Sequence, residues 1–415
     1  MPNRGWNSVR LEDLLESIFA GAWGEGPSDA RKPNVRVLRA TNIDSEGRVD
    51  YSSPALRVLG ASEVSRKRLH SGDLLLEASG GGPGTPVGRV ALHAVQSGKL
   101  DYTCSNFFRV LRPKTEVVHP RYLTHLLVAA YRSPRIWRYQ QQTTGLVNLK
   151  LKDYLKQSLW IPPINEQVRI VEILAGFEDA EHGIESSISK LRNVRHGALL
   201  ASMESVASET PAAGWTRVLL KDIVPSVEYG ISEALDGDAR GVPVLRMNNI
   251  QSARIDVDEL RYCPVPVPSK LFLRRGDVLF NRTNSMEHIG KTAMWRDELP
   301  SATFASYLVR LIPDLQRVTP EYLVEWLMHP LIRQRVRSIS TVAVQQVNVN
   351  PSRLRELKID LPVDLAEQRR IVATLEACDE QIGREKEELN KLRELKQGLV
   401  DDLLSGRVED SGLAA

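Results

Sequence analysis

The chain has 415 residues, and 42% of them are hydrophobic, which is enough for two or three globular cores. Its 55 Lys and Arg residues nearly balance its 52 Asp and Glu residues, so the net charge of +3 does not predict nonspecific binding to nucleic acid. The composition therefore excludes a disordered chain and a polycationic one, and any nucleic-acid binding has to come from local patterns.

Neither the cysteines nor the apolar segments indicate an exported or membrane protein. The three cysteines lie far apart and outside any CxxC spacing, which favours free thiols in a reducing compartment over disulfides or a zinc site. The first residues lack the apolar core and cleavage site of a signal peptide. No later apolar run reaches the roughly 20 residues that a membrane span needs. We therefore expect a cytoplasmic protein.

The most informative feature is an internal repeat, in which the second half of the chain restates the first about 200 residues later. Val37-Leu38-Arg39, for example, recurs as Val244-Leu245-Arg246. Six ordered blocks pair residues 37–43 with 244–250, 72–73 with 276–277, 119–123 with 319–323, 147–149 with 347–349, 166–171 with 367–372, and 190–192 with 391–393. Units of a solenoid have only about 20 to 50 residues, so the repeat predicts a duplicated pair of domains with pseudo-twofold symmetry.

Each half begins with a globular part of mixed secondary structure. Short β-rich runs at 73–76 and 277–280 alternate with Gly, Pro and Asn, and helical stretches follow at 122–132 and 322–331. Each globular part ends at a proline boundary. We therefore predict α/β (α+β) domains in tandem, each followed by a long helix and the second helix by a short tail. The predicted segments are 1–162, 163–207, 208–361, 362–407 and 408–415.

The two predicted helices carry a heptad pattern of apolar residues. In the first helix, one track holds Ile170, Phe177, Ile184, Leu191 and Ala198, and the other holds Ile173, Ala180 and Val194. In the second helix the tracks hold Ile371, Cys378, Leu392 and Leu399, and Leu375, Ile382, Leu389 and Leu403, with interruptions at Glu385 and Lys396. Helices of about 40 residues are roughly 60 Å long. Such narrow seams favour an antiparallel coiled coil between the two helices over packing of each helix on its own domain.

This arrangement resembles the specificity subunits of type I restriction-modification enzymes, over nearly the whole chain. The resemblance depends on the motif PPINEQ at 162–167, on its copy at 362–368, which has one extra residue, and on the Gly-Asp-Leu/Val-Leu block of each domain. It implies that each domain is a target-recognition domain for one half of a bipartite DNA site. It also implies that the helices set the spacing and bind two methyltransferase subunits, through which restriction and translocation subunits are recruited. S-adenosylmethionine, ATP and Mg would then belong to those partners, and this chain would hold no cofactor.

Three stretches in each domain have the residue types that read base edges. Arg, Asn, Gln, Ser and Thr on loops or strand ends supply the hydrogen bonds that distinguish base pairs in the major groove, and glycines allow close backbone approach. The candidate DNA contacts are Arg39, Thr41, Asn42, Ser79, Gly80, Gly81, Gln141, Gln142, Thr143 and Thr144, and in the second domain Arg246, Asn248, Asn249, Asn281, Arg282, Thr283, Asn284, Gln345 and Gln346. Asparagines that cap a turn and glutamines on a solvated surface are the alternative interpretations.

Arginines just before the third stretch are candidates for contacts with DNA phosphates. They are Arg135, Arg138, Arg333, Arg335 and Arg337. Such contacts set affinity and register but carry no sequence information. A solvated helix face is the alternative.

No motif indicates an active site or a metal site. Residues 288–292 end like a phosphate-binding loop, but Ser285 stands where the first glycine belongs. We find no methyltransferase motif, nuclease core or His-x-x-x-His pair. We therefore expect a noncatalytic DNA-binding subunit, whose two half-sites differ because the domains differ outside the matched blocks. A structural adaptor with two protein-binding domains and the specificity module of a methylation-only system remain the alternatives.

Overall fold

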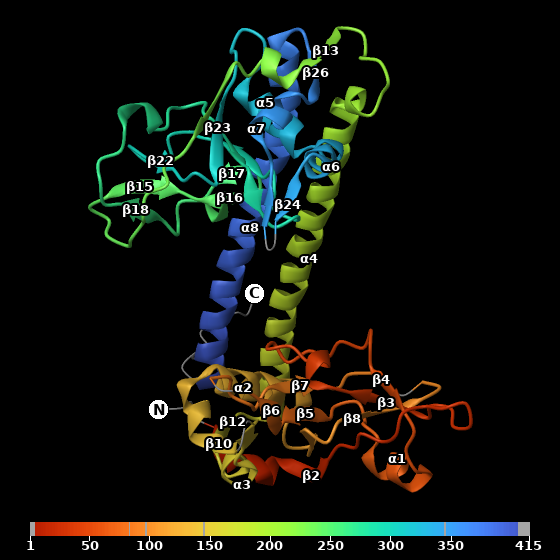
Figure 1. The fold of residues 1–415 in the computed structure, drawn as a ribbon. Coiled ribbons are helices and arrows are strands. Elements are labelled where there is room, and N and C mark those ends of the chain that lie inside the picture. Colours follow the sequence, from red (N-terminus) through yellow and green to blue (C-terminus); the bar gives the residue numbers. More distant parts are fainter. Residues whose placement is uncertain (1–4, 83, 96–97, 144–145, 344–345, 406–415) are drawn as a thin grey trace, which may run out of the picture. The chain divides into compact units, whose positions relative to one another are not determined.

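The computed structural model describes residues 5–82, 84–95, 98–143, 146–343 and 346–405. The chain divides into two compact units, Met1–Ile184 with Glu388–Ala415 and Glu185–Glu387. Each unit holds one globular domain, termed head 1 or head 2, and parts of both long helices, α4 (Ile164–Ser202) and α8 (Leu365–Ser405). Figure 1 shows these elements.

Head 1 is built around an antiparallel sheet with the strand order β2-β9-β5-β7. Two three-stranded sheets, β4-β3-β8 and β10-β11-β6, and the pair β1-β12 complete it. The strands are β1 Asn7–Arg10, β2 Leu15–Ala20, β3 Val35–Leu38, β4 Ala55–Arg57, β5 Leu74–Glu77, β6 Ser79–Gly81, β7 Val90–Leu92, β8 Asp101–Cys104, β9 Phe108–Pro113, β10 Gln140–Thr143, β11 Leu146–Leu149 and β12 Ser158–Ile161. The helices are α1 Ala61–Lys67, α2 Pro120–Arg132 and α3 Leu151–Leu155, with 3-10 turns η1 Leu11–Leu14, η2 Ala40–Asn42 and η3 Pro134–Tyr139.

The core of head 1 forms where apolar residues face both the sheet and a helix. Strand β5 is buried on both faces, and Pro120 at the first turn of α2 starts that helix without losing a hydrogen bond. Tyr122 and Leu123 on α2 are fully buried in the same cluster as Ile170 and Leu174 of α4. The core therefore continues from head 1 into the start of α4.

Head 2 repeats this topology strand for strand. Its sheets have the orders β14-β23-β19-β21, β18-β15-β22 and β20-β25-β24, with the pair β13-β26. The strands are β13 Trp215–Leu219, β14 Ser226–Tyr229, β15 Val242–Leu245, β16 Ile250–Gln251, β17 Arg254–Ile255, β18 Arg261–Cys263, β19 Val278–Asn281, β20 Thr283–Asn284, β21 Thr292–Met294, β22 Thr303–Phe304, β23 Leu308–Ile312, β24 Thr341–Ala343, β25 Gln346–Asn348 and β26 Lys358–Pro362. The helices are α5 Pro320–Met328, α6 Pro330–Ser338 and α7 Pro351–Arg355, with 3-10 turns η4 Glu204–Val206, η5 Leu220–Asp222, η6 Met247–Asn249 and η7 Ser269–Leu271. The duplication predicted from the repeat is therefore confirmed, and head 2 adds the hairpin β16-β17.

One glutamine of the PPINEQ motif explains why the motif recurs where each head meets its helix. The Gln167 side chain accepts a hydrogen bond from the His119 backbone nitrogen (2.8 Å) and donates to the carbonyl oxygens of Val117 (3.1 Å) and Pro162 (2.8 Å). The Gln368 side chain does the same with Thr319 (2.9 Å), Arg317 (2.9 Å) and Pro362 (2.9 Å). Both side chains are fully buried, so each amide fixes the loop before a head helix to the first turn of α4 or α8.

The two long helices pack against each other in an antiparallel arrangement, as the heptads predict. In the first unit the end of α8 meets the start of α4, where Lys396 Nζ lies 3.3 Å from Glu181 and 3.8 Å from Glu178. In the second unit the end of α4 meets the start of α8, where Arg195 Nε lies 2.6 Å from Asp379. The ten residues that the heptads assign to helix pairing are all buried or half-buried. They are Ile170, Phe177, Ile184, Leu191, Ile371, Leu375, Ile382, Leu389, Leu392 and Leu399.

One track of the α4 seam differs from the prediction. Ile173, Ala180 and Val194 are exposed, Val194 by 58%. The second track instead follows the first at a spacing of four residues and consists of Leu174, Glu181, Ile188 and Arg195. Glu181 and Arg195 are charged, so a prediction based on hydropathy chose the preceding apolar residues Ala180 and Val194 instead. Ion pairs with α8 allow Glu181 and Arg195 to lie in the seam.

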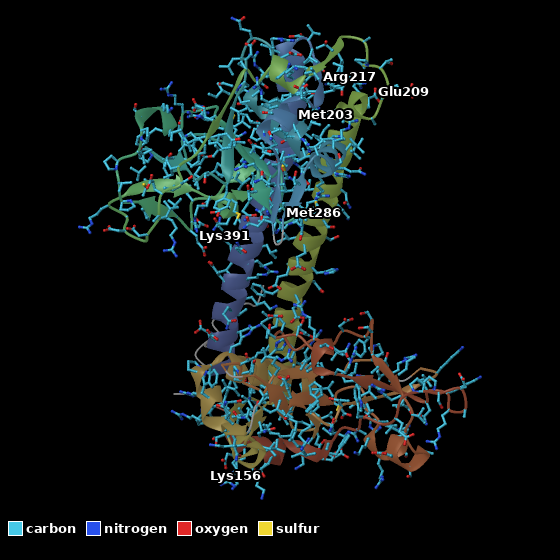
Figure 2. The ribbon with its side chains drawn as sticks, in the orientation of Figure 1. Lys156, Met203, Glu209, Arg217, Met286 and Lys391 are labelled. Carbon is cyan, nitrogen blue, oxygen red and sulfur yellow. The ribbon has the colours of Figure 1, made fainter. Side chains whose placement is uncertain are left out.

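A single arginine fixes the segment that connects α4 to head 2. Arg217 on β13 forms an ion pair with the buried Asp360 (2.6 Å) and donates to the carbonyl oxygens of Ser208 (2.8 Å) and Glu209 (2.7 Å). Arg217 and Glu209 are both labelled in Figure 2. Burial raises the pKa of Asp360, and Arg217 opposes that shift by stabilising the charged carboxylate. The same arginine therefore balances a buried charge and holds residues 208–209 against β13.

Candidate nucleic-acid interface

The second and third candidate stretches of each head meet in one three-stranded sheet, termed the reading sheet. In head 1, Asn148 on β11 lies opposite both Ser79 on β6 and Gln141 on β10. In head 2, Asn348 on β25 lies opposite both Thr283 on β20 and Thr341 on β24. The fold therefore brings together residues that are far apart in the sequence, in the same way in both heads.

Local geometry in head 1 presents two glutamines at the surface. Gln140 fixes the start of β10, because its side chain accepts from the Val87 nitrogen (2.9 Å) and donates to the carbonyl oxygens of Val87 (3.0 Å) and Ile136 (3.0 Å). Gln141 and Gln142 follow on the same strand and are exposed. A glutamine amide that is exposed in this way can form the bidentate hydrogen bonds that adenine accepts and donates in the major groove. Thr143 ends β10, and Thr144 lies outside the described residues.

Strand β6 in head 1 requires glycine. Gly80 has a φ of +119°, and a Cβ atom on Gly81 would lie 2.5 Å from the Thr85 carbonyl oxygen. Ser79 and Gly81 are half-buried, whereas Gly80 is exposed. A bare backbone at this point allows another molecule to approach closely.

The reading sheet of head 2 is held by a side-chain pair. Arg282 donates from Nη2 to Asn348 Oδ1 (2.9 Å), and its guanidinium carbon lies 5.2 Å from the centre of the exposed Tyr229 ring. Asn281 is fully buried, so we leave it out of the proposed contacts. Thr283 is also buried. The more accessible predicted residues are Arg282, Asn284 and Gln346, and Gln345 lies outside the described residues.

In the first stretch the asparagines cap a turn in both heads. Asn42 Oδ1 accepts from the Arg39 nitrogen (3.0 Å), and Asn249 Oδ1 accepts from the Arg246 nitrogen (2.8 Å). Both asparagine side chains are buried and also donate to the loops that follow, so we leave them out of the proposed contacts. Arg39 and Arg246 donate to the carbonyl oxygens of Ser53 (2.9 Å) and Glu259 (3.2 Å). Thr41 and Asn248, at the tips of η2 and η6, are exposed.

An arginine fixes η2 relative to the reading sheet of head 1. Arg89 forms a bidentate ion pair with Glu77, at 2.8 and 2.9 Å, and donates to the carbonyl oxygens of Ile43 (3.0 Å) and Ala40 (3.2 Å). The hydrogen bonds to Glu77 raise the pKa of Arg89, which keeps the arginine charged although it is half-buried. The tip that carries Thr41 is thereby connected to the end of β5, directly before β6.

The arginines predicted to contact phosphates differ in exposure and in whether they already donate a hydrogen bond to the backbone of another segment. Arg135 and Arg138 are exposed on η3, just before β10, on either side of the exposed Trp137. Arg333 is buried, donates to the Glu287 carbonyl oxygen (3.0 Å), and has its pKa lowered to about 10 by burial, so we leave it out. Arg335 and Arg337 are exposed, and each donates to a backbone carbonyl, that of Val206 (2.8 Å) and that of Glu287 (3.4 Å) respectively.

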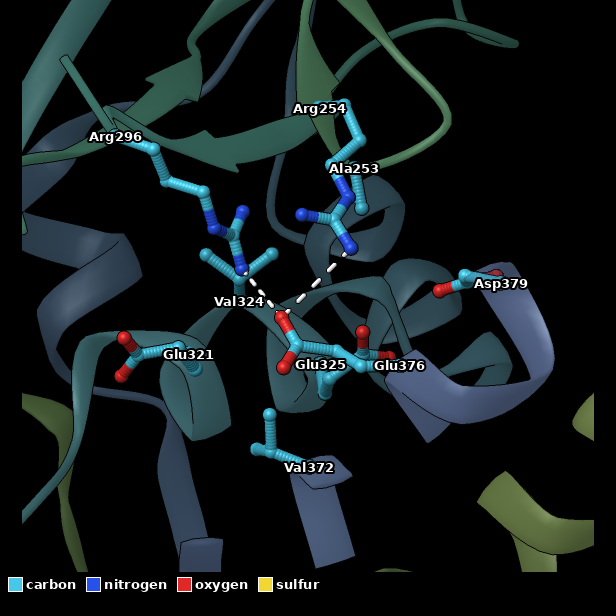
Figure 3. Close-up of a pocket in the computed structure, with 9 residues that line it drawn as sticks. All are labelled: Ala253, Arg254, Arg296, Glu321, Val324, Glu325, Val372, Glu376 and Asp379. Atoms are coloured by element: carbon cyan, nitrogen blue, oxygen red, sulfur yellow. Dashed lines mark hydrogen bonds and ion pairs between the residues drawn. The ribbon is translucent and has the colours of Figure 1, made fainter. Parts of the chain in front are cut away.

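Head 2 is joined to α8 by an ion-pair cluster that sequence reasoning missed. Arg296 Nη2 lies 2.7 Å from Glu376 Oε1, and Arg254 Nη2 lies 3.7 Å from the same oxygen. Figure 3 shows both arginines reaching toward α8 above a small pocket that Glu321 and Asp379 also line. No pattern could have indicated the cluster, because its members are distant in the sequence. Its carboxylates do not suit a DNA phosphate, and its geometry fixes the hairpin β16-β17 to the helix.

Among the residues that the structure describes, no group of three or more His, Cys, Asp or Glu side chains could hold a metal ion. Within the same residues, no helix is long and apolar enough to cross a membrane.

Comparison with protein families decides how these two heads are classified. The family model described as type I restriction modification DNA specificity domain matches residues 3–190 and again 213–394. The chain belongs to this family. Each matched range contains one head and most of the helix that follows it, so the two specificity domains coincide with the internal repeat.

Individual relatives agree with this assignment. The putative type I restriction enzyme MjaX specificity subunit of Methanocaldococcus jannaschii is 30% identical over 194 residues, which are 46% of this chain and 45% of that protein. The MjaVIII specificity subunit of the same organism is 22% identical over 98% of this chain and 94% of its own length. A structure solved to explain complex assembly and conformational transition of a type I R-M system has a TM-score of 0.59 at 19% identity, covering 98% of this chain and 100% of that one. At that identity, the structural likeness concerns the fold of the specificity domains alone.

Proposed function

We propose that this chain is the noncatalytic, DNA-reading specificity subunit of a type I restriction-modification enzyme. Each head reads a few base pairs in the major groove, and together they recognise one interrupted, asymmetric site. The observation that carries the proposal is the pair of reading sheets, which share one topology but present different side chains. Gln141 and Gln142 are exposed in head 1, whereas Arg282, Asn284 and Gln346 are accessible in head 2.

Different donors and acceptors on the two sheets predict different half-sites. A glutamine amide suits adenine, which offers one acceptor and one donor in the major groove. Arginine suits guanine, which offers two acceptors. In the free protein Arg282 donates from Nη2 to Asn348 (2.9 Å) and from Nη1 to the Ser306 carbonyl oxygen (3.4 Å), so it would have to exchange these hydrogen bonds for bonds to the base. Arg135 and Arg138 would neutralise phosphates beside half-site 1 without adding sequence preference.

The outer faces of the long helices support a role in assembly. Apolar side chains lie exposed on both helices, outside the seam. They are Ile164, Val168, Ile173, Val194 and Leu200 on α4 and Leu395 on α8. Exposed apolar residues along a helix can supply the contact surface for another protein. In our proposal two methyltransferase subunits bind there and recruit restriction and translocation subunits. S-adenosylmethionine, ATP and Mg are then used by these partners.

The proposal is tested by sequencing modified bases in the genome. Cells that carry this gene with a neighbouring methyltransferase gene are compared with cells in which this gene alone is deleted. We expect an interrupted, asymmetric motif to lose its methylation in the deletion. Unchanged methylation, or a continuous palindromic motif, would contradict the proposal. Challenge with unmethylated phage DNA then separates a restricting enzyme from one that only methylates.

A further inference from the structure

An exposed aromatic ring occupies the same turn in both heads. Phe107, between β8 and β9, is 44% exposed, and Tyr307, between β22 and β23, is 46% exposed. The next residues, Phe108 and Leu308, are fully buried. Each turn therefore points one large side chain inward and the preceding one outward.

The backbone of each ring residue is connected to the reading sheet through one intermediate residue. In head 1 the Phe107 carbonyl accepts from the Ala78 nitrogen (2.8 Å), and the Ala78 carbonyl accepts from the Leu149 nitrogen at the end of β11 (2.9 Å). In head 2 the Tyr307 carbonyl accepts from the Arg282 nitrogen (3.0 Å), whose carbonyl accepts from the Val349 nitrogen (2.8 Å). Ala78 and Arg282 directly precede β6 and β20. The two rings therefore stand at equivalent positions beside the two reading sheets.

A glycine packs closely against the start of each turn, where there is no room for a side chain. A Cβ atom on Gly21 would lie 2.2 Å from the Cys104 carbonyl oxygen, and one on Gly230 would lie 2.1 Å from the Phe304 carbonyl oxygen. The turns are also closed internally, by hydrogen bonds from Phe108 to Ser105 (3.0 Å) and from Leu308 to Ala305 (2.9 Å). Rings on such fixed turns lose little conformational entropy when they bind a partner.

From this shared geometry we propose that Phe107 and Tyr307 contact duplex DNA, each supplying the apolar contact of its head. The partner chemistry is the thymine methyl group in the major groove, which an aromatic side chain recognises and no hydrogen bond can. The inference rests on the proposed function and adds specificity residues to it. Single exposed apolar residues are common, but these two recur at one position in heads whose reading residues differ.

The test measures binding of the assembled methyltransferase to a duplex that carries the motif found by modified-base sequencing. We expect Phe107→Ala and Tyr307→Ala each to weaken specific binding about tenfold. Because neither ring is charged, the slope of log affinity against log salt should not change. The conservative variants Phe107→Tyr and Tyr307→Phe should keep the wild-type affinity. Leu56→Ala and Val265→Ala are matched controls, at 46% and 44% exposure, and should bind like wild type.

A second experiment removes the methyl group from the DNA and leaves the ring in the protein. Each thymine of half-site 1 is replaced in turn by deoxyuridine. At the thymine that Phe107 contacts, the replacement should weaken binding of wild type and leave binding of Phe107→Ala unchanged. The same replacement in half-site 2 should weaken binding of wild type and leave binding of Tyr307→Ala unchanged. If the alanine variants match the controls while wild type prefers the motif, the inference is wrong and the proposed function stands. If wild type itself shows no preference for the motif, the proposed function fails.

Discussion

Replacing Arg195 by alanine should destabilise the second unit more than any nearby charge change on the same helix. Arg195 lies in the seam of α4 and binds Asp379 on α8 (2.6 Å) and Glu325 on α5 (2.8 Å). Its side chain is 20% exposed and that of Glu325 only 9%. Removing the arginine leaves a buried carboxylate without its partner, which costs 3 to 5 kcal/mol in a fully buried pair, so we expect about 2 to 3 kcal/mol here.

The sign of the pH dependence follows from Glu325. Burial raises the pKa of this carboxyl, and Arg195 opposes the rise. Without Arg195 the folded protein binds the Glu325 proton more tightly than the unfolded chain does, so folding stability falls as pH rises above the ordinary value of 4.5. The destabilisation of Arg195→Ala should therefore be smallest at acidic pH and grow toward neutrality.

Hydrogen exchange resolved by segment is the suitable assay, because the chain has two units and one global unfolding transition is not assured. We expect amides of α5 and of the end of α4 to exchange about 30- to 160-fold faster in Arg195→Ala. Arg192→Ala, an exposed change on the same helix, is the matched control and should exchange like wild type. If Arg195→Ala and Arg192→Ala exchange alike at neutral pH, the seam ion pair contributes no stability and the reasoning is refuted.

Three further predictions concern a close contact, the phosphate contacts and the head joint. Gly230→Ala should destabilise the second unit by more than about 3 kcal/mol, because its Cβ meets backbone atoms, whereas Gly197→Ala, with open space around it, should stabilise it by about 0.5 to 1 kcal/mol. Hydrogen exchange resolved by segment measures both effects, and equal exchange rates in the two variants would refute the contact. Arg135→Gln with Arg138→Gln should reduce the salt slope of DNA binding by about 0.9 per lost contact and leave the motif unchanged; an altered motif would show that these arginines read bases. Glu376→Gln should accelerate hydrogen exchange in the hairpin β16-β17 about fivefold, and no acceleration would mean that the ion pair between Arg254 on β17 and Glu376 does not hold the joint.

Much of the architecture follows from sequence because it depends on periodic patterns. The repeat predicts two equivalent heads, and the apolar tracks of α8 mark its buried face, from Ile371 to Leu399. Hydropathy fails where charge enters the seam. Glu181 and Arg195 lie at seam positions because each meets an opposite charge on α8, and only the fold brings those partners together.

The candidate interface was less predictable than the fold. Residue type identified the stretches that share a reading sheet, but it did not separate an exposed glutamine such as Gln141 from a buried cap such as Asn42. That distinction depends on which hydrogen bonds the local backbone offers, as in the turn at Arg39. Phe107 and Tyr307 carry no sequence signal of contact, because their exposure depends on the turn in which each lies, and a glycine distant in the sequence packs against that turn.

The central claim is that the two heads read two different halves of one DNA site. It is tested most directly by sequencing modified bases in cells that express the chain with Gln141→Ala and Gln142→Ala, and separately with Asn284→Ala and Gln346→Ala. We expect each pair of substitutions to relax or abolish one half of the methylated motif while the other half and the gap between them are retained. If either pair alters both halves alike, or if neither pair changes the motif, the account is contradicted.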